Sequence, residues 1–224
     1  MNGARHIERR INNSLPVARE GLPFIFGSLL LTCAFFLAGP LFLVIPASVV
    51  TLFIICFFRD PDRENHGGDR AVLTPADGKV IKVEHLQGHN NPLGEPAIKV
   101  SIFMSLLDVH VNRIPVSGRI LEVKYKPGRF FSANLDKASE ENEHNQVTLE
   151  TGGGHRVVFV QIAGLIARRI VCWIRTGDVV SAGQRCGLIR FGSRLDVYVP
   201  AESHLTVKVR DRVRAGETIL GYLP

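Results

Sequence analysis

The dipeptide Gly192-Ser193 is where residue type and spacing best support chemistry in this chain. A Gly-Ser pair usually marks a turn. Here it interrupts a run typical of a β-strand, with apolar residues on both sides: Leu188, Ile189, Phe191, Leu195, Val197, Tyr198 and Val199. Glycine inside a strand indicates a bulge or a close backbone approach, and it tolerates strained backbone angles. The Ser193 hydroxyl is therefore a candidate to attack the Gly192 carbonyl and shift the acyl group from nitrogen to oxygen.

Two other segments carry side chains suited to proton transfer. Thr74-Pro-Ala-Asp-Gly78 is a turn between strands with Asp77 at its tip, where an ordinary turn residue is the alternative. Asp108-Val-His-Val-Asn-Arg-Ile-Pro115, if extended, places Asp108, His110 and Asn112 on one face. Histidine suits proton transfer near neutral pH, although a lone histidine is more often structural. His144 is a second, weaker candidate.

Four segments together resemble the short-form prokaryotic phosphatidylserine decarboxylases, a pyruvoyl-dependent family of proenzymes. The segments are Gly187-Leu-Ile-Arg-Phe-Gly-Ser-Arg-Leu-Asp-Val-Tyr-Val-Pro200, Thr74–Gly78, Asp108–Pro115 and Gln161-Ile-Ala-Gly164. The resemblance covers the chain from about Arg59 to its end. Any one segment alone would be a weak signal, but the set is specific.

The resemblance implies a carboxy-lyase that cuts itself between Gly192 and Ser193. A β-chain of residues 1–192 and an α-chain of residues 193–224 would remain together as a heterodimer, and Ser193 would become a pyruvoyl group. That group would form a Schiff base with phosphatidylserine and release carbon dioxide and phosphatidylethanolamine. No metal is implied. Whether the mature pieces form a homo-oligomer stays open.

The resemblance also implies that Asp77 takes part in self-cleavage. The chain departs from longer family members at Arg113, where they carry a second histidine, and a guanidinium cannot act as a base. The role of that second histidine could then pass to His110 or to Asp77, or backbone strain alone could drive the cleavage. We favour His110 for this role and as the source of the proton needed after decarboxylation. From residue type, Arg113, Arg190 and Arg194 are candidates to bind the lipid phosphate.

A stretch without charged residues, 21–58, precedes these segments. It divides at Gly39-Pro40 into Leu22–Ala38 and Leu41–Phe58, each close to the ~20 residues that span a bilayer. Basic residues flank both ends: Arg5, Arg9, Arg10, Arg19, Arg59, Arg63 and Arg70. The pattern predicts a hairpin with both ends cytoplasmic, and hence an enzyme at the cytoplasmic face of the cell membrane. A cleaved signal peptide and a buried soluble hairpin are the alternatives.

The chain therefore divides into a basic segment (1–20), a membrane helical hairpin (21–58), a linker (59–70) and a catalytic β-domain (71–224). Asp-x-Val-x-Ala-Gly occurs twice, beginning at Asp178 and at Asp211, with short alternating strands around it. This pattern predicts a mainly β (α+β) fold, a β-sandwich or partly closed barrel similar to lipoyl or biotinyl carrier domains. The likeness to carrier domains also supports an alternative hypothesis, in which the chain is a membrane-anchored adaptor without catalytic activity. A true carrier is disfavoured because Gly192-Ser193, and not a lysine, interrupts the strand pattern between the repeats.

Composition narrows the partners. The net charge of +6 calls for an anionic partner, and beside an apolar hairpin an anionic lipid explains it better than a nucleic acid does. The four cysteines show no metal-binding or disulfide spacing.

Overall fold

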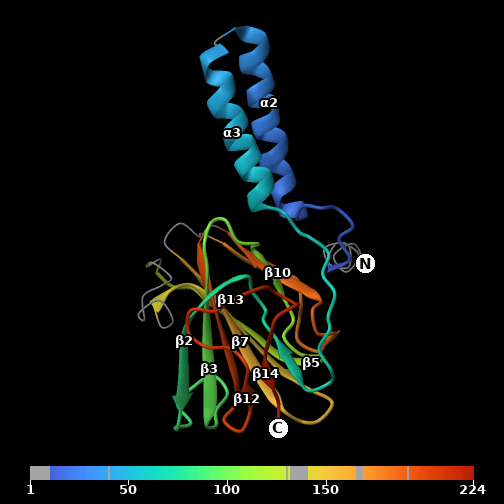
Figure 1. The fold of residues 1–224 in the computed structure, drawn as a ribbon, viewed down its shortest axis with the longest axis vertical. Helices are drawn as coiled ribbons and strands as arrows, with labels where there is room; N and C mark the ends of the chain where they lie inside the picture. The colour runs from blue at the N-terminus through green and yellow to red at the C-terminus, as the bar shows by residue number, and fades with distance from the viewer. Residues whose placement is uncertain (1–10, 40, 130, 132–140, 165–168, 191) are drawn as a thin grey trace.

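A helical hairpin projects from one end of a β-domain (Figure 1). The computed structural model describes residues 11–39, 41–129, 131, 141–164, 169–190 and 192–224. Arg5, Arg9, Arg10, Pro40 and Phe191 lie outside these ranges. A short 3-10 helix, η1 (Arg19–Gly21), leads into α2 (Leu22–Ala38), and α3 (Leu41–Phe57) returns to the domain. The helix bounds differ from the predicted ones only at the end of α3.

The side chains of the hairpin are largely exposed. Leu37 and Phe42 are each 77% exposed, and most other large apolar residues of the two helices are also uncovered. The segment Arg19–Ala38 is long and apolar enough to cross a membrane, whereas α3 is a shorter apolar helix. A hairpin buried in a soluble core would hide these side chains, so the structure does not support that alternative.

The domain consists of short strands, as predicted. Their bounds are β1 (Ala71–Leu73), β2 (Gly78–Leu86), β3 (Ala97–Met104), β4 (Val111–Arg113), β5 (Gly118–Lys126), β6 (His144–Glu150), β7 (Arg156–Ala163), β8 (Ile170–Cys172), β9 (Val179–Val180), β10 (Arg185–Ile189), β11 (Ser193–Pro200), β12 (His204–Leu205), β13 (Arg212–Val213) and β14 (Ile219–Tyr222).

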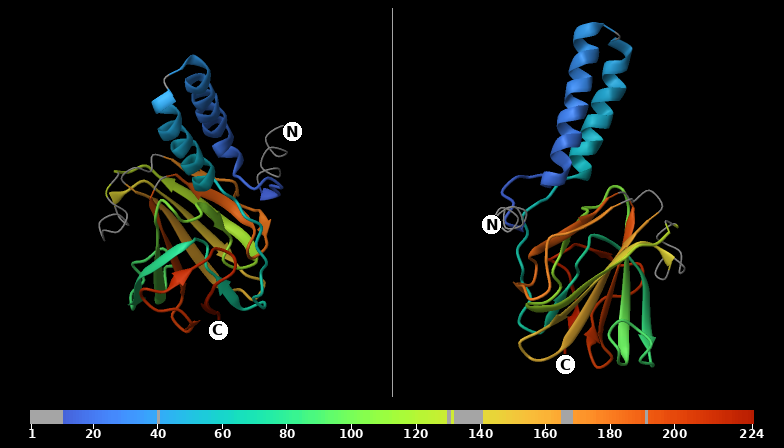
Figure 2. Two further views of the ribbon diagram at one scale, coloured as in Figure 1. Left: turned by 45° about the horizontal axis from the view of Figure 1, so that its top comes forward. Right: turned by 180° about the vertical axis from the view of Figure 1, so that it is seen from behind.

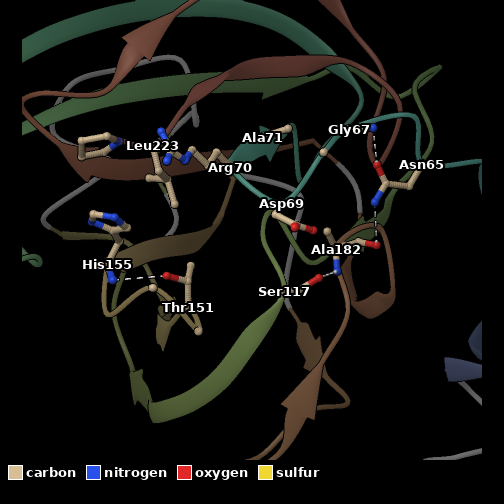
Figure 3. A pocket seen from close by; sticks show the side chains of 14 residues that line it. Asn65, Gly67, Asp69, Arg70, Ala71, Ser117, Thr151, His155, Ala182 and Leu223 are labelled. Atoms are coloured by element: carbon tan, nitrogen blue, oxygen red, sulfur yellow. Dashed lines mark hydrogen bonds between the residues drawn. The ribbon is translucent and has the colours of Figure 1, made fainter.

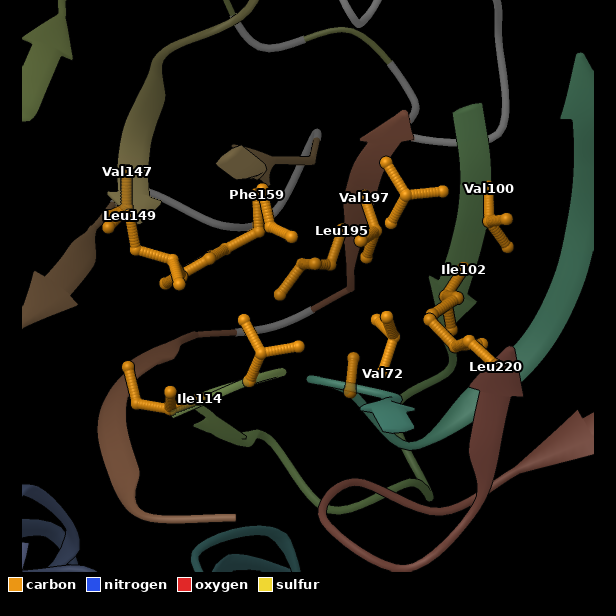
Figure 4. Close-up of a cluster of buried hydrophobic side chains, with 14 of the residues drawn as sticks. Val72, Val100, Ile102, Ile114, Val147, Leu149, Phe159, Leu195, Val197 and Leu220 are labelled. Atoms are coloured by element: carbon orange, nitrogen blue, oxygen red, sulfur yellow. The ribbon is translucent and has the colours of Figure 1, made fainter. Parts of the chain in front are cut away.

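The strands form one curled sheet of eight and two sheets of three (Figure 2). The large sheet has the order β13-β2-β3-β11-β7-β6-β5-β9, and the small sheets have the orders β1-β14-β12 and β4-β10-β8. Apolar side chains from all three sheets meet in one core, including Val72, Ile114, Phe159 and Leu195 (Figure 4). The mainly β, partly closed architecture predicted from the sequence is confirmed.

The strand order has an internal two-fold symmetry. β11 pairs with β7 at the centre of the large sheet, and the strands outward from them, β3-β2-β13 and β6-β5-β9, correspond one to one. The edge strands β13 and β9 belong to the two copies of the Asp-x-Val-x-Ala-Gly motif. The two three-stranded sheets correspond in the same way.

The symmetry extends to individual contacts. Val213 pairs with Gly78 at one edge, and Val180 pairs with Gly118 at the other. Thr74-Pro-Ala-Asp-Gly78 therefore corresponds to Ile114-Pro-Val-Ser-Gly118, a duplication too diverged for the sequence reasoning to detect. Contacts that occur in both halves serve the fold, whereas a contact found in one half is specific to that half.

Candidate functional site

Ser193 is the first residue of the central strand β11. Its neighbours across the sheet are Met104 on β3 and Ala163 on β7, and its side chain is fully buried. Gly192 before it has φ +65°, in the left-handed region that L-residues with a side chain rarely adopt. The Ser193 Oγ donates to Met104 Sδ at 3.7 Å, and thioether sulfur is a weak acceptor. Within the described part of the chain, this weak hydrogen bond is the contact that positions the hydroxyl.

Three buried side-chain amides form a chain of hydrogen bonds that ends at the same sulfur. Asn145 Nδ2 donates to Gln161 Oε1 at 3.0 Å, and Gln161 Nε2 donates to Asn112 Oδ1 at 2.9 Å. Asn112 Nδ2 then donates to Met104 Sδ at 3.6 Å. We call Asn145, Gln161 and Asn112 the amide triad. The sequence places Asn112 in the predicted polar row and Gln161 in the segment Gln161–Gly164, but it did not single out Asn145 or predict that the three amides meet. The signal that could have found Asn145 is an amide side chain within an otherwise apolar strand.

His110 lies directly beneath the hairpin. Its ring centroid is 4.1 Å from that of Phe57, the last residue of α3. Its Nδ1 is 2.9 Å from the backbone carbonyl of Asp108, so Nδ1 carries the proton and Nε2 the lone pair. Nε2 is buried and has no hydrogen-bond partner among the described residues. Burial lowers the pKa of His110 to about 4, opposed by its hydrogen bond to Asp108 and by the Asp108 and Asp77 carboxylates. His110 is therefore neutral at pH 7, as a base must be.

Asp77 is held more firmly than a turn residue requires. Its Oδ1 accepts the Ala215 N–H at 2.8 Å, and the Arg63 guanidinium contacts both oxygens, at 2.6 and 2.8 Å. In the other half the Ser117 hydroxyl accepts the Ala182 N–H at 2.9 Å, which is the same contact made without a charge. The fold therefore needs an acceptor at this turn but not a negative charge. The charge is specific to the half that contains Ser193, and it acts on His110.

The three candidate arginines have different surroundings. Arg194 is fully buried, and it contacts Asp196 at 2.6 Å and Ser101 at 2.8 Å. Arg113 donates to the carbonyls of Gly183 and Pro61, both at 2.8 Å. Both guanidinium groups are thus engaged by protein atoms inside the domain.

Arg190 lies at the junction of hairpin and domain, just before the Gly-Ser pair. Its guanidinium carbon is 5.3 Å from the ring centroid of Phe24 on α2. Its Nε is buried without a hydrogen-bond partner among the described residues. Burial and the neighbouring Arg169 lower the pKa of Arg190, which Glu20 opposes. Of the three candidate arginines, Arg190 is the one that lies against the hairpin.

The structure also places His144, the second histidine candidate, and the residues of the predicted polar row. His144 begins β6, and its Nδ1 is 2.8 Å from the carbonyl of Asn142. The segment Asp108–Pro115 is not extended throughout, because β4 begins only at Val111. The side-chain direction of His110 is therefore set by the preceding turn, in which Asp108 accepts from the N–H and Oγ of Ser105.

A cavity of about 550 Å³ at the far end of the domain is the two-fold counterpart of this site (Figure 3). It is lined by Ser117, Thr151, His155 and Ala182, among others. By the strand register, the first three correspond to Asp77, Met104 and Ser193. The counterpart thus lacks both the carboxylate and the Gly-Ser pair, so its size does not indicate the same chemistry. Among the described residues, no group of three or more His, Cys, Asp or Glu could hold a metal ion.

Comparisons with known proteins show the family of this chain. The sequence model of the phosphatidylserine decarboxylase family matches residues 50–221. A phosphatidylserine decarboxylase proenzyme of Syntrophus aciditrophicus is 51% identical, over 92% of this chain and 96% of the relative. Proenzymes of the same name from Pelobacter propionicus and Burkholderia mallei are 49% and 46% identical, over 95% and 93% of this chain and 99% and 95% of theirs.

The fold, the site and these matches define a carboxy-lyase that is made as a proenzyme. The chain belongs to the phosphatidylserine decarboxylase family. The non-catalytic adaptor is not favoured, because the similarity to named decarboxylase proenzymes extends over nearly the whole of each chain.

Proposed function

We propose that this chain cuts its own backbone between Gly192 and Ser193 and uses the new end at residue 193 to decarboxylate phosphatidylserine to phosphatidylethanolamine. The observation that carries the proposal is the Gly-Ser pair itself. A left-handed glycine leads into a buried serine whose hydroxyl, among the described residues, donates to a weak acceptor, the Met104 sulfur. Such a hydroxyl is poorly satisfied where it stands, and it is adjacent to the carbonyl that it would attack.

The cutting step needs no outside reagent. Ser193 Oγ bonds to the Gly192 carbonyl carbon, the Ser193 nitrogen leaves with a proton, and an ester results. Loss of the α-proton of residue 193 then breaks the Oγ–Cβ bond, releasing the Gly192 carboxylate as the end of the β-chain (1–192). Water converts the remaining dehydroalanine to a ketone, with loss of ammonia. The α-chain (193–224) would begin with this pyruvoyl group, and the two chains would remain paired through β11.

His110 is the proposed base. Its neutral Nε2 lone pair can accept the proton that leaves Ser193, and the nearby Asp77 charge stabilises the resulting imidazolium. The ketone supplies a covalent hold on the substrate amine and an acceptor for the electron pair left when carbon dioxide departs. A proton held on His110 can then be transferred to the substrate carbon that lost the carboxylate. Because Phe57 covers the histidine ring, this exchange is shielded from bulk water.

The hairpin would bring the site to its substrate. We propose that α2 and α3 lie in the membrane with both ends on the cytoplasmic side. Seventeen residues span roughly 25 Å, close to the ~30 Å hydrocarbon core. Pulling a phospholipid out of a bilayer costs about 0.8 kcal/mol per CH₂. An enzyme anchored above its substrate avoids that cost, because only the headgroup has to rise into the site.

Arg190 is the proposed phosphate contact. We expect Arg190→Gln to raise the apparent KM for phosphatidylserine in mixed micelles about tenfold, since a charge-assisted hydrogen bond contributes ~1.5–3 kcal/mol. Exposed Arg156 lies at the opposite end of the domain, so Arg156→Gln is the matched control and should leave KM unchanged. Equal KM values for the two variants would exclude Arg190 from phosphate binding.

The two-fold counterpart supplies a test for Asp77. The double variant Arg63→Asn/Asp77→Ser copies the contacts at the counterpart turn, where Ser117 accepts the Ala182 N–H and Asn65 of the linker donates to the Ala182 carbonyl at 3.4 Å. We expect the domain to fold, because Ser can accept the Ala215 N–H, and self-cleavage to slow about 10²-fold, because the charge beside His110 is gone. Glu217→Gln removes a different carboxylate near Arg63 and is the control. Cleavage at the wild-type rate in the double variant would show that the Asp77 charge is not needed.

Intact mass analysis of the purified protein tests the proposed function directly. We expect two chains, with masses that match residues 1–192 and 193–224, the smaller one bearing a ketone in place of an amino terminus. It should therefore resist Edman degradation. A single intact chain with full decarboxylase activity would reject the proposal.

A further inference from the structure

Burying the amide triad in the core of a β-domain has a large desolvation cost. Its three members are at most 2% exposed, and each buried amide must find partners for its donors and acceptor. Apolar side chains would fill the same space without that requirement. A buried polar network that is retained under these conditions calls for an explanation.

The corresponding positions in the other half show that the fold itself does not require amides. Asn145 and Gln161 face each other across β6 and β7, and Ile98 and Val199 face each other across β3 and β11. Asn112, the second residue of β4, corresponds to Val72, the second residue of β1. Ile98, Val199 and Val72 are buried members of the main hydrophobic core. Two halves with the same architecture thus differ at these positions, and the polar set is the one that reaches Ser193.

The triad also has a direction. Asn145 donates to the Gln161 carbonyl, which leaves the Gln161 NH₂ to donate to the Asn112 carbonyl. The Asn112 NH₂ must then point away from Gln161, toward Met104 Sδ, which the Ser193 hydroxyl also contacts. Because sulfur is a weak acceptor, this N–H is held in position yet loses little if it turns to an oxygen anion.

We propose that Asn112 donates a hydrogen bond to the Gly192 carbonyl oxygen while negative charge develops on it during self-cleavage, and that Gln161 and Asn145 are the positioning residues that orient the Asn112 amide. The inference rests on the proposed function. When Ser193 Oγ bonds to the Gly192 carbon, the carbonyl electron pair moves onto that oxygen. Expulsion of the Ser193 nitrogen returns the pair, and Asn112 neither gains nor loses a proton. A donor that Gln161 already orients toward the site accelerates acyl transfer because it needs little reorganisation as the charge forms.

The first experiment transplants the apolar set. In Asn145→Ile/Gln161→Val/Asn112→Val the three amides that pair with one another are removed together, and the Cys172 thiol near Asn145 keeps its contact with the Ile174 carbonyl. The domain should therefore fold about as stably as wild type. The full-length chain is made by cell-free synthesis with phospholipid vesicles and pulse-labelled, and conversion to two chains is followed over time. We expect conversion to slow by about 10²-fold, the cost of losing one oxyanion donor. Conversion within threefold of wild type, in a variant with wild-type melting temperature, would overturn the inference.

The second experiment reverses the amide while preserving its shape. An ionised Glu in Gln161→Glu only accepts hydrogen bonds, so Asn112 must turn its NH₂ toward it and present its carbonyl oxygen to Ser193. We expect slow self-cleavage at pH 8.5 that recovers as the pH falls to 6, because a protonated Glu donates as Gln does and burial raises the pKa of a carboxyl group. The Cys172 and Cys186 thiols near the triad stay neutral over this range, since burial raises the pKa of both. Nearby Arg113 remains charged throughout.

Gln146→Glu is the matched control for the added acid. Gln146 neighbours Asn145 on β6 and therefore faces the opposite side of the sheet. The control should cut at the wild-type rate at every pH. A Gln161→Glu variant whose rate equals that of the control at pH 8.5, or stays slow at pH 6, would contradict the proposed orientation mechanism. If wild type and control also remained uncut, the proposed function itself would fail, an outcome distinct from a defect confined to the triad variants.

Discussion

Ser193→Ala should yield one uncut chain with no detectable decarboxylase activity. Alanine has the size of serine without its hydroxyl, so the acyl shift has no nucleophile and no ketone can form at residue 193. The environment of the side chain is already tight and apolar, with β3 and β7 on either side, so the variant should fold normally. Denaturing gel electrophoresis and intact mass report the cutting, and release of carbon dioxide from labelled phosphatidylserine reports the activity. We expect both signals to be lost together.

Ser203→Ala is the matched control. Ser203 is also buried, and its Oγ has no hydrogen-bond partner among the described residues, so its removal should affect neither folding nor cutting. Two chains from Ser193→Ala, or normal activity in its uncut form, would mean that residue 193 is neither the cleaving nucleophile nor the source of the ketone.

His110→Phe should have the next largest effect. Phenylalanine preserves the ring contact with Phe57 but removes the Nε2 lone pair. General acid–base catalysis by a positioned side chain contributes ~10²–10⁴-fold, and we expect a loss in that range. Comparison with the Arg63→Asn/Asp77→Ser variant also identifies the cleavage base. A chain that cuts normally without His110 but slowly without Asp77 would assign the cutting step to the carboxylate.

The same substitution should make the protein less sensitive to acid. The pKa of His110 is about 4 in the folded protein and about 6.5 when unfolded, so between these values the unfolded chain binds a proton that the folded chain does not. The free energy of unfolding therefore falls as the pH drops from 6.5 to 4, by about 3 kcal/mol from this group alone. Unfolding in detergent, in the Ser193→Ala background so that each chain stays whole, should show this loss when His110 is present and lack it in the His110→Phe variant. Equal acid sensitivity would indicate that His110 is not buried in its neutral form.

Local sequence patterns determined much of this protein. The run without charges has the length of two helices, and Gly39-Pro40 divides it close to the observed helix ends. Period-two alternation and glycine turns predicted a mainly β domain. The Gly-Ser pair was conspicuous because it interrupts such a pattern. Each of these features depends on residues within a few positions of one another, so a linear reading detects it.

The tertiary structure decided what depends on strand register. Arg113 and Arg194 have the same residue type as Arg190, yet only the pairing of distant segments brought the first two to Pro61 and Ser101 and left Arg190 beside the hairpin. The amide triad joins β4 to the later strands β6 and β7, and the two-fold relation, of which the sequence shows the repeated Asp-x-Val-x-Ala-Gly motif, is complete only in the strand order. Antiparallel register brings together side chains that carry no sequence signal of their partnership, and for that reason the surroundings of Ser193 could be found only in three dimensions.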